Sequence, residues 1–90
     1  MGTVYLIHFD IPFWHARHYV GYTDNLEGRL EMHKKGQGAR LIQVIQEAMI
    51  DWEVVRVWEN EDREFERFIK NTKNTAHYCP ICRKKRRRWR

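Results

Sequence analysis

Two apolar segments near the N-terminus, joined by a short polar connection, constrain the fold more than any other feature of this sequence. Residues 3–9 (TVYLIHF) and 18–22 (HYVGY) are rich in β-branched and aromatic side chains, a composition typical of strands. The connection, residues 10–17, contains Pro12 and is too short for the helical crossover that parallel strands need. The two segments are therefore predicted to pair as antiparallel strands.

A helix is predicted immediately after the second strand. Thr23 or Asp24 is a suitable N-cap, and Glu27 lies three residues after Asp24, as in a capping box. The helix is expected to reach about Lys35 and to stop at Gly36.

Three further elements complete the predicted fold. Residues 39–49 carry apolar side chains at helical spacing, and residues 52–58 (WEVVRVW) form a third strand. The acidic residues within 59–62 suit the positive N-terminal end of a last helix. Its buried stripe is predicted to comprise Phe65, Phe68 and Ile69. The chain is therefore predicted to be an α/β protein of the α+β kind, with a small three-stranded antiparallel or mixed sheet flanked by three helices in the order β-β-α-α-β-α.

The length of 90 residues predicts a single folded domain. We expect it to span residues 1–75, followed by a Cys-x-x-Cys segment and a basic tail over residues 76–90. Hydrophobic residues make up 42% of the chain, which is typical of a folded protein. No apolar run approaches the ~20 residues of a membrane span, and the N-terminus lacks the pattern of a secretory signal. These features predict a cytoplasmic protein.

The positive charge of the chain is concentrated at its C-terminus. The formal net charge is +5, but seven of the 17 basic residues lie in the last eight positions, RKKRRRWR, so the remaining 10 are outnumbered by 12 acidic residues. Such a run can serve solubility alone, but arginine forks bind phosphate and a tryptophan can stack on a base. We therefore predict that nucleic acid binds Arg83, Lys84, Lys85, Arg86, Arg87, Arg88 and Arg90.

Five polar side chains lie beside the predicted core. Arg29 and His33 are four residues apart on the first helix, so they share a face at the border between core and solvent. Tyr5 and Tyr19 lie on the paired strands, and Glu66 lies beside the apolar stripe of the last helix. Each of these residues, taken alone, is compatible with an ordinary role in packing or at the boundary of the core.

Taken together, these residues resemble the GIY-YIG nuclease family. Thr3-Val4-Tyr5 stands where the family has Gly-Ile-Tyr, and Tyr19-Val20-Gly21 stands for Tyr-Ile-Gly. The following segment matches the family at Thr23, Asn25-Leu26, Arg29 and His33. Glu66, trailed by Ile69-Lys70, is similar to the family's metal-binding glutamate. The resemblance covers about residues 3–73. It implies that the chain is a small single-domain member with the family's fold and nuclease activity.

The chain departs from the family pattern in two places. Thr3 replaces the first glycine at a strand position, which puts little in doubt. Residues 10–17 form a longer connection than in typical members. Its aromatic residues Phe13, Trp14 and His15 are expected to contact substrate or to shield a wall of the site.

The resemblance implies catalysis that depends on a divalent metal. One Mg²⁺ or Mn²⁺ ion held by Glu66 would polarise the phosphate and neutralise the leaving group, and Arg29 would offer its planar fork to the scissile phosphate. Tyr5 or Tyr19 would take the proton from water, assisted by His33. Tyr5 is the preferred base, although the sequence does not decide between the two. Because a phenol has a pKa of about 10, a nearby guanidinium and the metal would have to lower it.

The cysteines suggest a second metal site. His77, Cys79 and Cys82 offer three zinc ligands, one short of a closed tetrahedral site. His15, His18 or a second copy of the chain would supply the fourth ligand. The alternatives are a pair of unliganded thiols in a loose tail, or a zinc ion that only fastens the C-terminus to the fold.

The function predicted from the sequence is a metal-dependent endonuclease that acts on single- or double-stranded DNA. Its intrinsic sequence specificity is expected to be low, because 90 residues leave little room for a separate sequence-reading domain, unless a partner protein supplies specificity. Trp14 or Trp89 could stack on unpaired bases. Two alternatives stay open, namely a non-catalytic nucleic-acid-binding module with a C-terminal zinc knuckle, and a nuclease acting on RNA.

Overall fold

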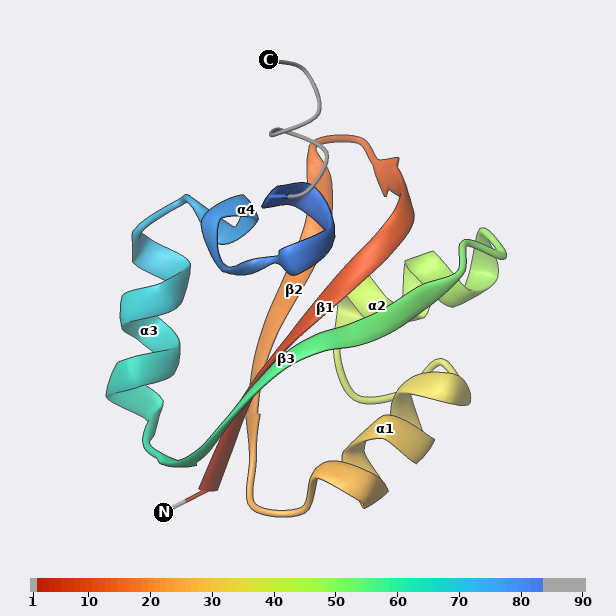
Figure 1. Ribbon diagram of the computed structural model, residues 1–90. Coiled ribbons are helices and arrows are strands. Elements are labelled where there is room, and N and C mark those ends of the chain that lie inside the picture. The colour runs from red at the N-terminus through yellow and green to blue at the C-terminus, as the bar shows by residue number, and fades with distance from the viewer. Residues whose placement is uncertain (1, 84–90) are drawn as a thin grey trace.

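The computed structural model describes residues 2–83 and contains a three-stranded antiparallel sheet flanked by helices (Figure 1). Met1 and residues 84–90, which hold most of the basic tail, lie outside the described range. The element order is β1 (Gly2–Phe13), β2 (Ala16–Thr23), α1 (Leu26–Lys34), α2 (Arg40–Glu47), β3 (Trp52–Glu61), α3 (Arg63–Asn71) and α4 (Thr75–Tyr78). The predicted α+β class and the order β-β-α-α-β-α are confirmed, with α4 as an addition in the C-terminal segment.

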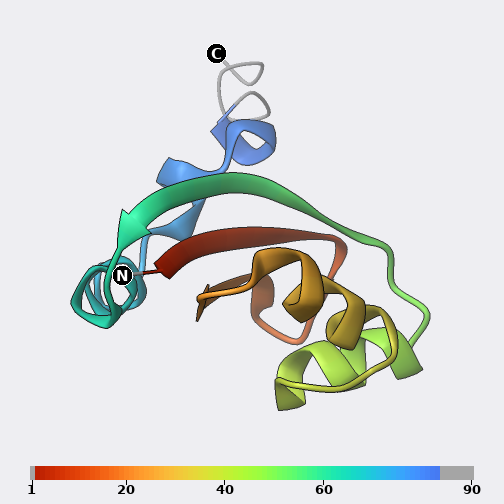
Figure 2. The same cartoon turned by 90° about the horizontal axis from the view of Figure 1, so that it is seen from below.

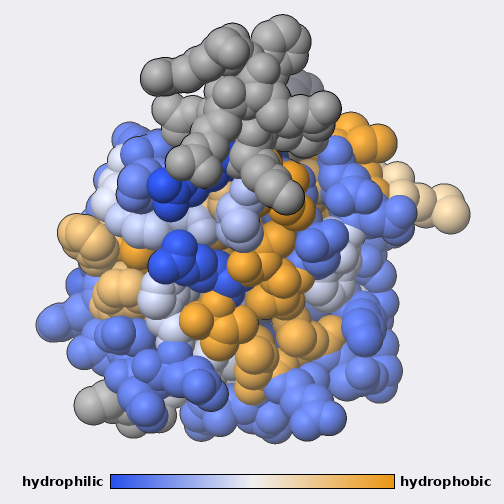
Figure 3. Space-filling model, viewed as in Figure 1, coloured by the Kyte–Doolittle hydropathy of each residue, from blue (hydrophilic) through white to orange (hydrophobic). Residues whose placement is uncertain are grey.

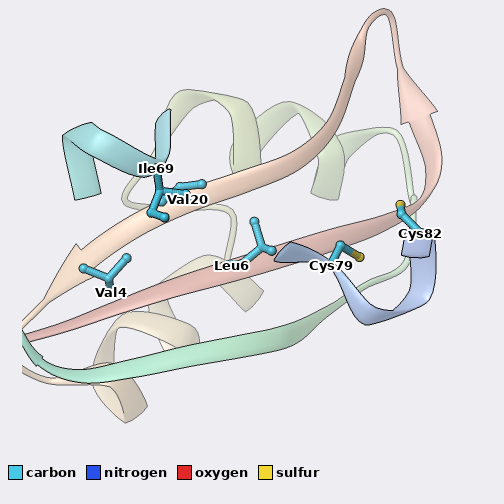
Figure 4. Close-up of a cluster of buried hydrophobic side chains, with 6 residues drawn as sticks. All are labelled: Val4, Leu6, Val20, Ile69, Cys79 and Cys82. Carbon is cyan, nitrogen blue, oxygen red and sulfur yellow. The ribbon is translucent and has the colours of Figure 1, made fainter. Parts of the chain in front are cut away.

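Strand β1 lies between β2 and β3, and its side chains alternate between two cores. One core comprises Val4, Leu6, Val20, Ile69, Cys79 and Cys82 (Figure 4). The other comprises Tyr5, Ile7, Phe9, Ile42 and Ile45. Figure 2 shows α1 and α2 on one side of the sheet and α3 on the other. Because both faces of the central strand are covered, residues 4–9 are all buried.

The face seen in Figure 3 carries both hydrophilic and apolar side chains. Figure 3 shows apolar side chains gathered near the centre of one face, with hydrophilic side chains around them. Within residues 2–83, no helix has the length and apolar character needed to cross a membrane.

The β1–β2 hairpin is tighter than predicted. The sequence predicts a loop over residues 10–17, whereas β1 continues to Phe13 and β2 begins at Ala16, which leaves only a short turn. Strand β3 pairs with β1 only as far as Phe9. Pro12 therefore lies beyond that ladder, where a missing N–H is tolerated. The prediction of a loop over residues 10–17 is therefore wrong, and the expected contact of Phe13, Trp14 and His15 with substrate stays a prediction.

Helix α1 begins one or two residues later than predicted. The N-cap is Asn25, whose Oδ1 accepts a hydrogen bond from the backbone N–H of Gly28 (3.2 Å), rather than Thr23 or Asp24. Thr23 instead accepts a hydrogen bond from the N–H of Asn25 through its hydroxyl oxygen (3.1 Å). A Cβ at Gly28 would lie 2.7 Å from Nδ2 of Asn25. The glycine therefore gives the capping side chain room to fold over the first turn of the helix.

Helix α3 is fastened to the sheet by fewer apolar residues than predicted. Its N-cap is Asp62, whose carboxylate accepts a hydrogen bond from the N–H of Phe65 (3.0 Å). Ile69 is buried and Phe65 is half-buried, but Phe68 is 57% exposed. Phe68 is rotated by about 100° from Ile69 around the helix axis. It stacks on Phe65 instead of entering the core, with ring centroids 6.4 Å apart.

Gly21 positions the ring of Tyr5. These two residues are directly paired across β1 and β2. A Cβ at Gly21 would collide with the ring and hydroxyl of Tyr5 and would lie 2.8 Å from Cε2 of Tyr19. The absent side chain therefore creates the space in which the Tyr5 phenol lies across β2.

Replacing Gly21→Ala should destabilise the fold by about 1–3 kcal/mol, because the new methyl group overpacks the site of Tyr5. Alanine is otherwise the better strand residue, since it loses less backbone entropy on folding. Urea unfolding, followed by tryptophan fluorescence, measures the change. An equal or higher free energy of unfolding in the variant would contradict the close packing inferred here.

Candidate active site and metal-ligand cluster

A hydrogen bond between Tyr5 and His33 is the centre of the candidate active site. The Tyr5 hydroxyl lies 2.8 Å from Nε2 of His33, and both side chains are fully buried. Nδ1 of His33 lies 3.3 Å from the backbone carbonyl oxygen of Gln37, which can only accept. Nδ1 therefore carries the proton, Nε2 is the acceptor, and the Tyr5 hydroxyl donates to it.

Tyr19 and Trp52 complete the walls around this pair. The Tyr19 ring is 6.1 Å from that of Tyr5 and 5.7 Å from that of His33, and the last contact is edge to face. Trp52 of β3 also contacts the imidazole of His33 edge to face, with ring centroids 6.3 Å apart. Tyr19 is half-buried, whereas Tyr5 is not exposed at all. Tyr19 is therefore the phenol of the pair that solvent reaches.

Arg29 brings a positive charge to the two phenols. Hydrogen bonding to Tyr5 is the main cause that raises the pKa of Arg29, and Tyr19 contributes in the same direction. Among the described residues, Nε of Arg29 is buried and has no hydrogen-bond partner. An unsatisfied buried donor is costly, so this N–H is a candidate contact for an anionic ligand.

Burial governs the protonation states of the site. It raises the pKa of Tyr5 to about 12, an effect that Tyr19 reinforces and Arg29 opposes. Burial also lowers the pKa of His33, and the neighbouring Arg29 adds to this shift, although the hydrogen bond to Gln37 opposes it. At neutral pH the site therefore holds a protonated Tyr5 and a neutral His33.

Four of the five predicted catalytic residues are brought together, and His33 lies deeper than predicted. The sequence predicts Arg29 and His33 at the border between core and solvent, but His33 is fully buried because its ring inserts between Tyr5, Tyr19 and Trp52. Trp52 was not among the predicted site residues, because its position in a strand indicated only a packing role.

Glu66 comes from a different helix than Arg29 and His33, and within residues 2–83 no hydrogen bond or ion pair joins it to the four clustered residues. It belongs to α3, which packs through Ile69 against the face of the sheet opposite to Tyr5. Its carboxylate is 3.1 Å from Nζ of Lys70, one helical turn away, and the Glu66 side chain is 15% exposed. Within residues 2–83, this ion pair is the contact described for the Glu66 carboxylate. Its predicted role as a metal ligand stays a prediction.

A second cluster lies on the α3 side of the sheet and contains four residues with metal-ligand atoms. They are His8, His18, Cys79 and Cys82, and their ligand atoms all lie within 4.8 Å of one another. Nδ1 of His8 is 3.4 Å from Nε2 of His18 and 3.4 Å from Sγ of Cys79. Sγ of Cys82 is 3.7 Å from Nδ1 of His8 and 3.4 Å from Nε2 of His18. This group could hold a metal ion.

The ligand set differs from the one that the sequence suggested. Cys79, Cys82 and the proposed fourth ligand His18 are present, but His77 is exposed and its ring packs against Tyr78. In its place stands His8, which lies directly opposite His18 in the strand pairing. His8 was missed because it lies inside an apolar strand, and only the register shows that it faces His18.

Burial keeps His18 neutral as well. Its pKa is lowered to about 4, first by burial and then by the neighbouring His8 and Arg17. A neutral imidazole is the form that binds metals.

The comparisons with known proteins identify one family. The family model of the GIY-YIG catalytic domain matches residues 1–79. No curated protein and no solved structure matches the chain. The matched region contains both strand tyrosines and the arginine and histidine of α1, which the fold gathers on one face of the sheet. Because the match extends over most of the 90 residues, this chain belongs to the GIY-YIG family, whose members are nucleases.

Proposed function

We propose that this protein is a divalent-metal-dependent endonuclease that hydrolyses DNA phosphodiester bonds with low intrinsic sequence specificity. The observation that carries the proposal is the cluster of Tyr5, Tyr19, Arg29 and His33 in a member of a nuclease family. A module that only binds nucleic acid would need the positive charge of Arg29 but not the two tyrosines and the histidine. The buried Tyr5–His33 hydrogen bond favours a site that also moves protons.

Arg29 is proposed to bind the scissile phosphate. Its guanidinium has donors on a rigid planar fork that fits two phosphate oxygens. Hydrogen bonding to the phenols of Tyr5 and Tyr19 raises the pKa of Arg29, while Nε has no acceptor among the described residues. A phosphate oxygen would supply one, and the charge of Arg29 would stabilise the extra negative charge of the transition state.

Tyr19 is proposed to contact the attacking water, with Tyr5 and His33 behind it. The complete burial of Tyr5 and its raised pKa disfavour it as the group that meets the water, although the sequence favoured it. The hydroxyl of Tyr5 already donates to the neutral Nε2 of His33. As the water gives a proton to the Tyr19 oxygen, Tyr19 passes its own proton to the oxygen of Tyr5, and Tyr5 passes its proton to Nε2 of His33. Both phenols then stay neutral, and His33 becomes an imidazolium.

Glu66 is proposed to hold the divalent ion. A single carboxylate suits Mg²⁺, because this ion retains several waters and takes further ligands from phosphate oxygens. When bound, the cation would neutralise charge on the phosphate and on the leaving oxygen. The ammonium group of Lys70 now pairs with the carboxylate, but this lysine is half-exposed and can move into solvent.

The basic tail is proposed to anchor the nucleic acid. Arg83 is exposed at the end of the described range, and Lys84, Lys85, Arg86, Arg87, Arg88 and Arg90 lie outside it. A run of this charge binds phosphates without reading bases, in keeping with low specificity. The same tail would hold RNA equally well, so RNA is the alternative substrate.

Arg29→Ala and Glu66→Gln should each reduce DNA cleavage in Mg²⁺ or Mn²⁺ by about 100-fold or more, because each removes a group that stabilises the transition state. Gel assays with single- and double-stranded DNA measure the rates, and circular dichroism checks the fold.

The matched controls are Arg40→Ala and Glu64→Gln, which remove an exposed arginine of α2 and an exposed glutamate of α3. Both should cut like the wild type. Wild-type protein that yields no chelator-sensitive product from DNA or RNA would instead support the non-catalytic binding module.

Cleavage should decline as the pH falls below 6.5, because a protonated His33 can no longer accept the hydrogen bond from Tyr5. Burial lowers the pKa of His33, so the neutral ring persists below the pH at which a free histidine is half protonated, and the loss must lie on the acid side of pH 6.5. In His33→Gln, the amide oxygen can accept from Tyr5 at every pH. Because glutamine cannot take up a proton, this variant should cleave more slowly than the wild type, but its rate should not change between pH 7 and pH 5. An unchanged acid decline would refute the role of His33.

Deleting residues 84–90 should weaken DNA binding and reduce its salt dependence. The deletion removes six basic side chains, so the slope of log K against log salt should become shallower by up to about 5. Fluorescence anisotropy over a range of KCl concentrations measures both quantities. The control Trp89→Ala keeps the charge and should leave the slope unchanged. An unaltered slope after the deletion would show that the tail does not contact phosphate.

A further inference from the structure

We propose that His8, His18, Cys79 and Cys82 form a structural zinc site that fastens the C-terminal segment to the sheet. The inference is independent of the proposed nuclease activity. It rests on the geometry of the four ligand atoms, on a hydrogen bond behind one of the ligands, and on the burial of the group.

The spacing of the ligand atoms fits a tetrahedron around zinc. Zinc bonds of 2.0–2.1 Å to nitrogen and of about 2.3 Å to sulfur require edges of about 3.4 Å for N···N and about 3.6 Å for N···S. The observed N···N distance between His8 and His18 is 3.4 Å, and the three described N···S distances are 3.4, 3.4 and 3.7 Å. The remaining pairs lie within 4.8 Å. Four of the six edges therefore match a tetrahedral zinc site, and the other two, which both involve Cys79, would adjust to bonding distance when the ion binds.

The orientation of His18 also suits a ligand. Its Nδ1 lies 3.0 Å from the hydroxyl oxygen of Thr75, while Nε2 faces the sulfur of Cys82 and the nitrogen of His8. With the proton on Nδ1 donated to Thr75, the lone pair of Nε2 points into the cluster. A histidine that ligates a metal usually donates its other ring N–H in this way, which fixes the tautomer.

Burial and charge favour zinc in a closed, structural site. His8, Cys79 and Cys82 are each at most 7% exposed, so four protein ligands leave little room for substrate. Two thiolates and two neutral imidazoles around Zn²⁺ give a net charge of zero, which a buried site tolerates. A tetrahedral set of two sulfur and two nitrogen ligands is typical of zinc.

The cluster joins parts of the chain that are distant in sequence. His8 and His18 form a pair across β1 and β2, whereas Cys79 and Cys82 follow α4 and cover the core of Val4 and Leu6 (Figure 4). Cys82 lies beyond the match to the family model, which ends at residue 79, so family membership alone does not account for this site. Arg83, the first residue of the basic tail, directly follows Cys82. The zinc ion would therefore fix the point from which the tail leaves the fold.

Metal analysis of the full chain tests this proposal. The protein, stripped with chelator and reloaded with ZnCl₂, should retain about one zinc ion per chain after dialysis and should melt at a higher temperature than the stripped protein. Cys82→Ser should lower the retained zinc to about a tenth or less. The control His77→Ala, which removes an exposed histidine outside the cluster, should retain zinc like the wild type.

Cobalt substitution in the wild-type chain gives a readout that does not depend on any variant folding. Tetrahedral Co²⁺ with two thiolates should show strong visible bands and a thiolate charge-transfer band in the near ultraviolet. Loss of these bands on adding equimolar Zn²⁺ would support the site. A stripped chain that binds neither metal with this signature, or a His77→Ala variant that loses zinc as Cys82→Ser does, would overturn it.

Discussion

The register of the β1–β2 pair is the constraint on which both candidate sites depend. Tyr5 pairs with Gly21, and His8 pairs with His18. Because side chains alternate along a strand, odd and even positions of β1 face opposite layers. One register therefore places Tyr5 beside Tyr19 under α1, and His8 beside His18 under the C-terminal segment. A slip of one residue would send each of these side chains to the wrong layer.

Within the candidate active site, His33 and Arg29 differ in how fully their buried nitrogen atoms are hydrogen-bonded. Both ring nitrogens of His33 have partners, one on Tyr5 and one on the backbone of Gln37, so the imidazole is held in one tautomer inside an aromatic cage. Arg29 is the exception, because its Nε has no acceptor among the described residues. The fold therefore holds the imidazole of His33 in place as a proton acceptor. It also leaves one N–H of Arg29 available to bind an anion.

The layered arrangement also separates the roles of the helices. Helix α1 carries Arg29 and His33 onto the aromatic face, whereas α3, which packs in the other layer through Ile69, carries Glu66 in an ion pair with Lys70. The metal proposed at Glu66 would thus act from a different element than the phosphate-binding arginine. The C-terminal segment covers the α3 layer, where Cys79 and Cys82 belong to the same core as Ile69. Any metal bound by the cysteines would therefore stabilise the layer that positions α3.

Local pattern in the sequence determined the helices and strands and their order along the chain. Strand composition, the short connection after Phe9 and the helical spacing of Ile42 and Ile45 are local signals, and the structure contains the elements that they predict. The resemblance to GIY-YIG nucleases grouped Tyr5, Tyr19, Arg29 and His33, and the fold brings these four side chains together, while their catalytic roles stay a prediction.

Only the tertiary structure decided how deeply His33 is buried, which of its ring nitrogens carries the proton, and which histidines lie beside the cysteines. Sequence spacing places His33 on a helix face, but it cannot say that Trp52 and two tyrosines close over that face. It cannot choose His8 over His77 either, because His77 is two residues from Cys79 along the chain whereas His8 reaches the thiol only through the strand register. Local propensity acts over a few residues, and contacts between distant segments depend on how whole layers pack.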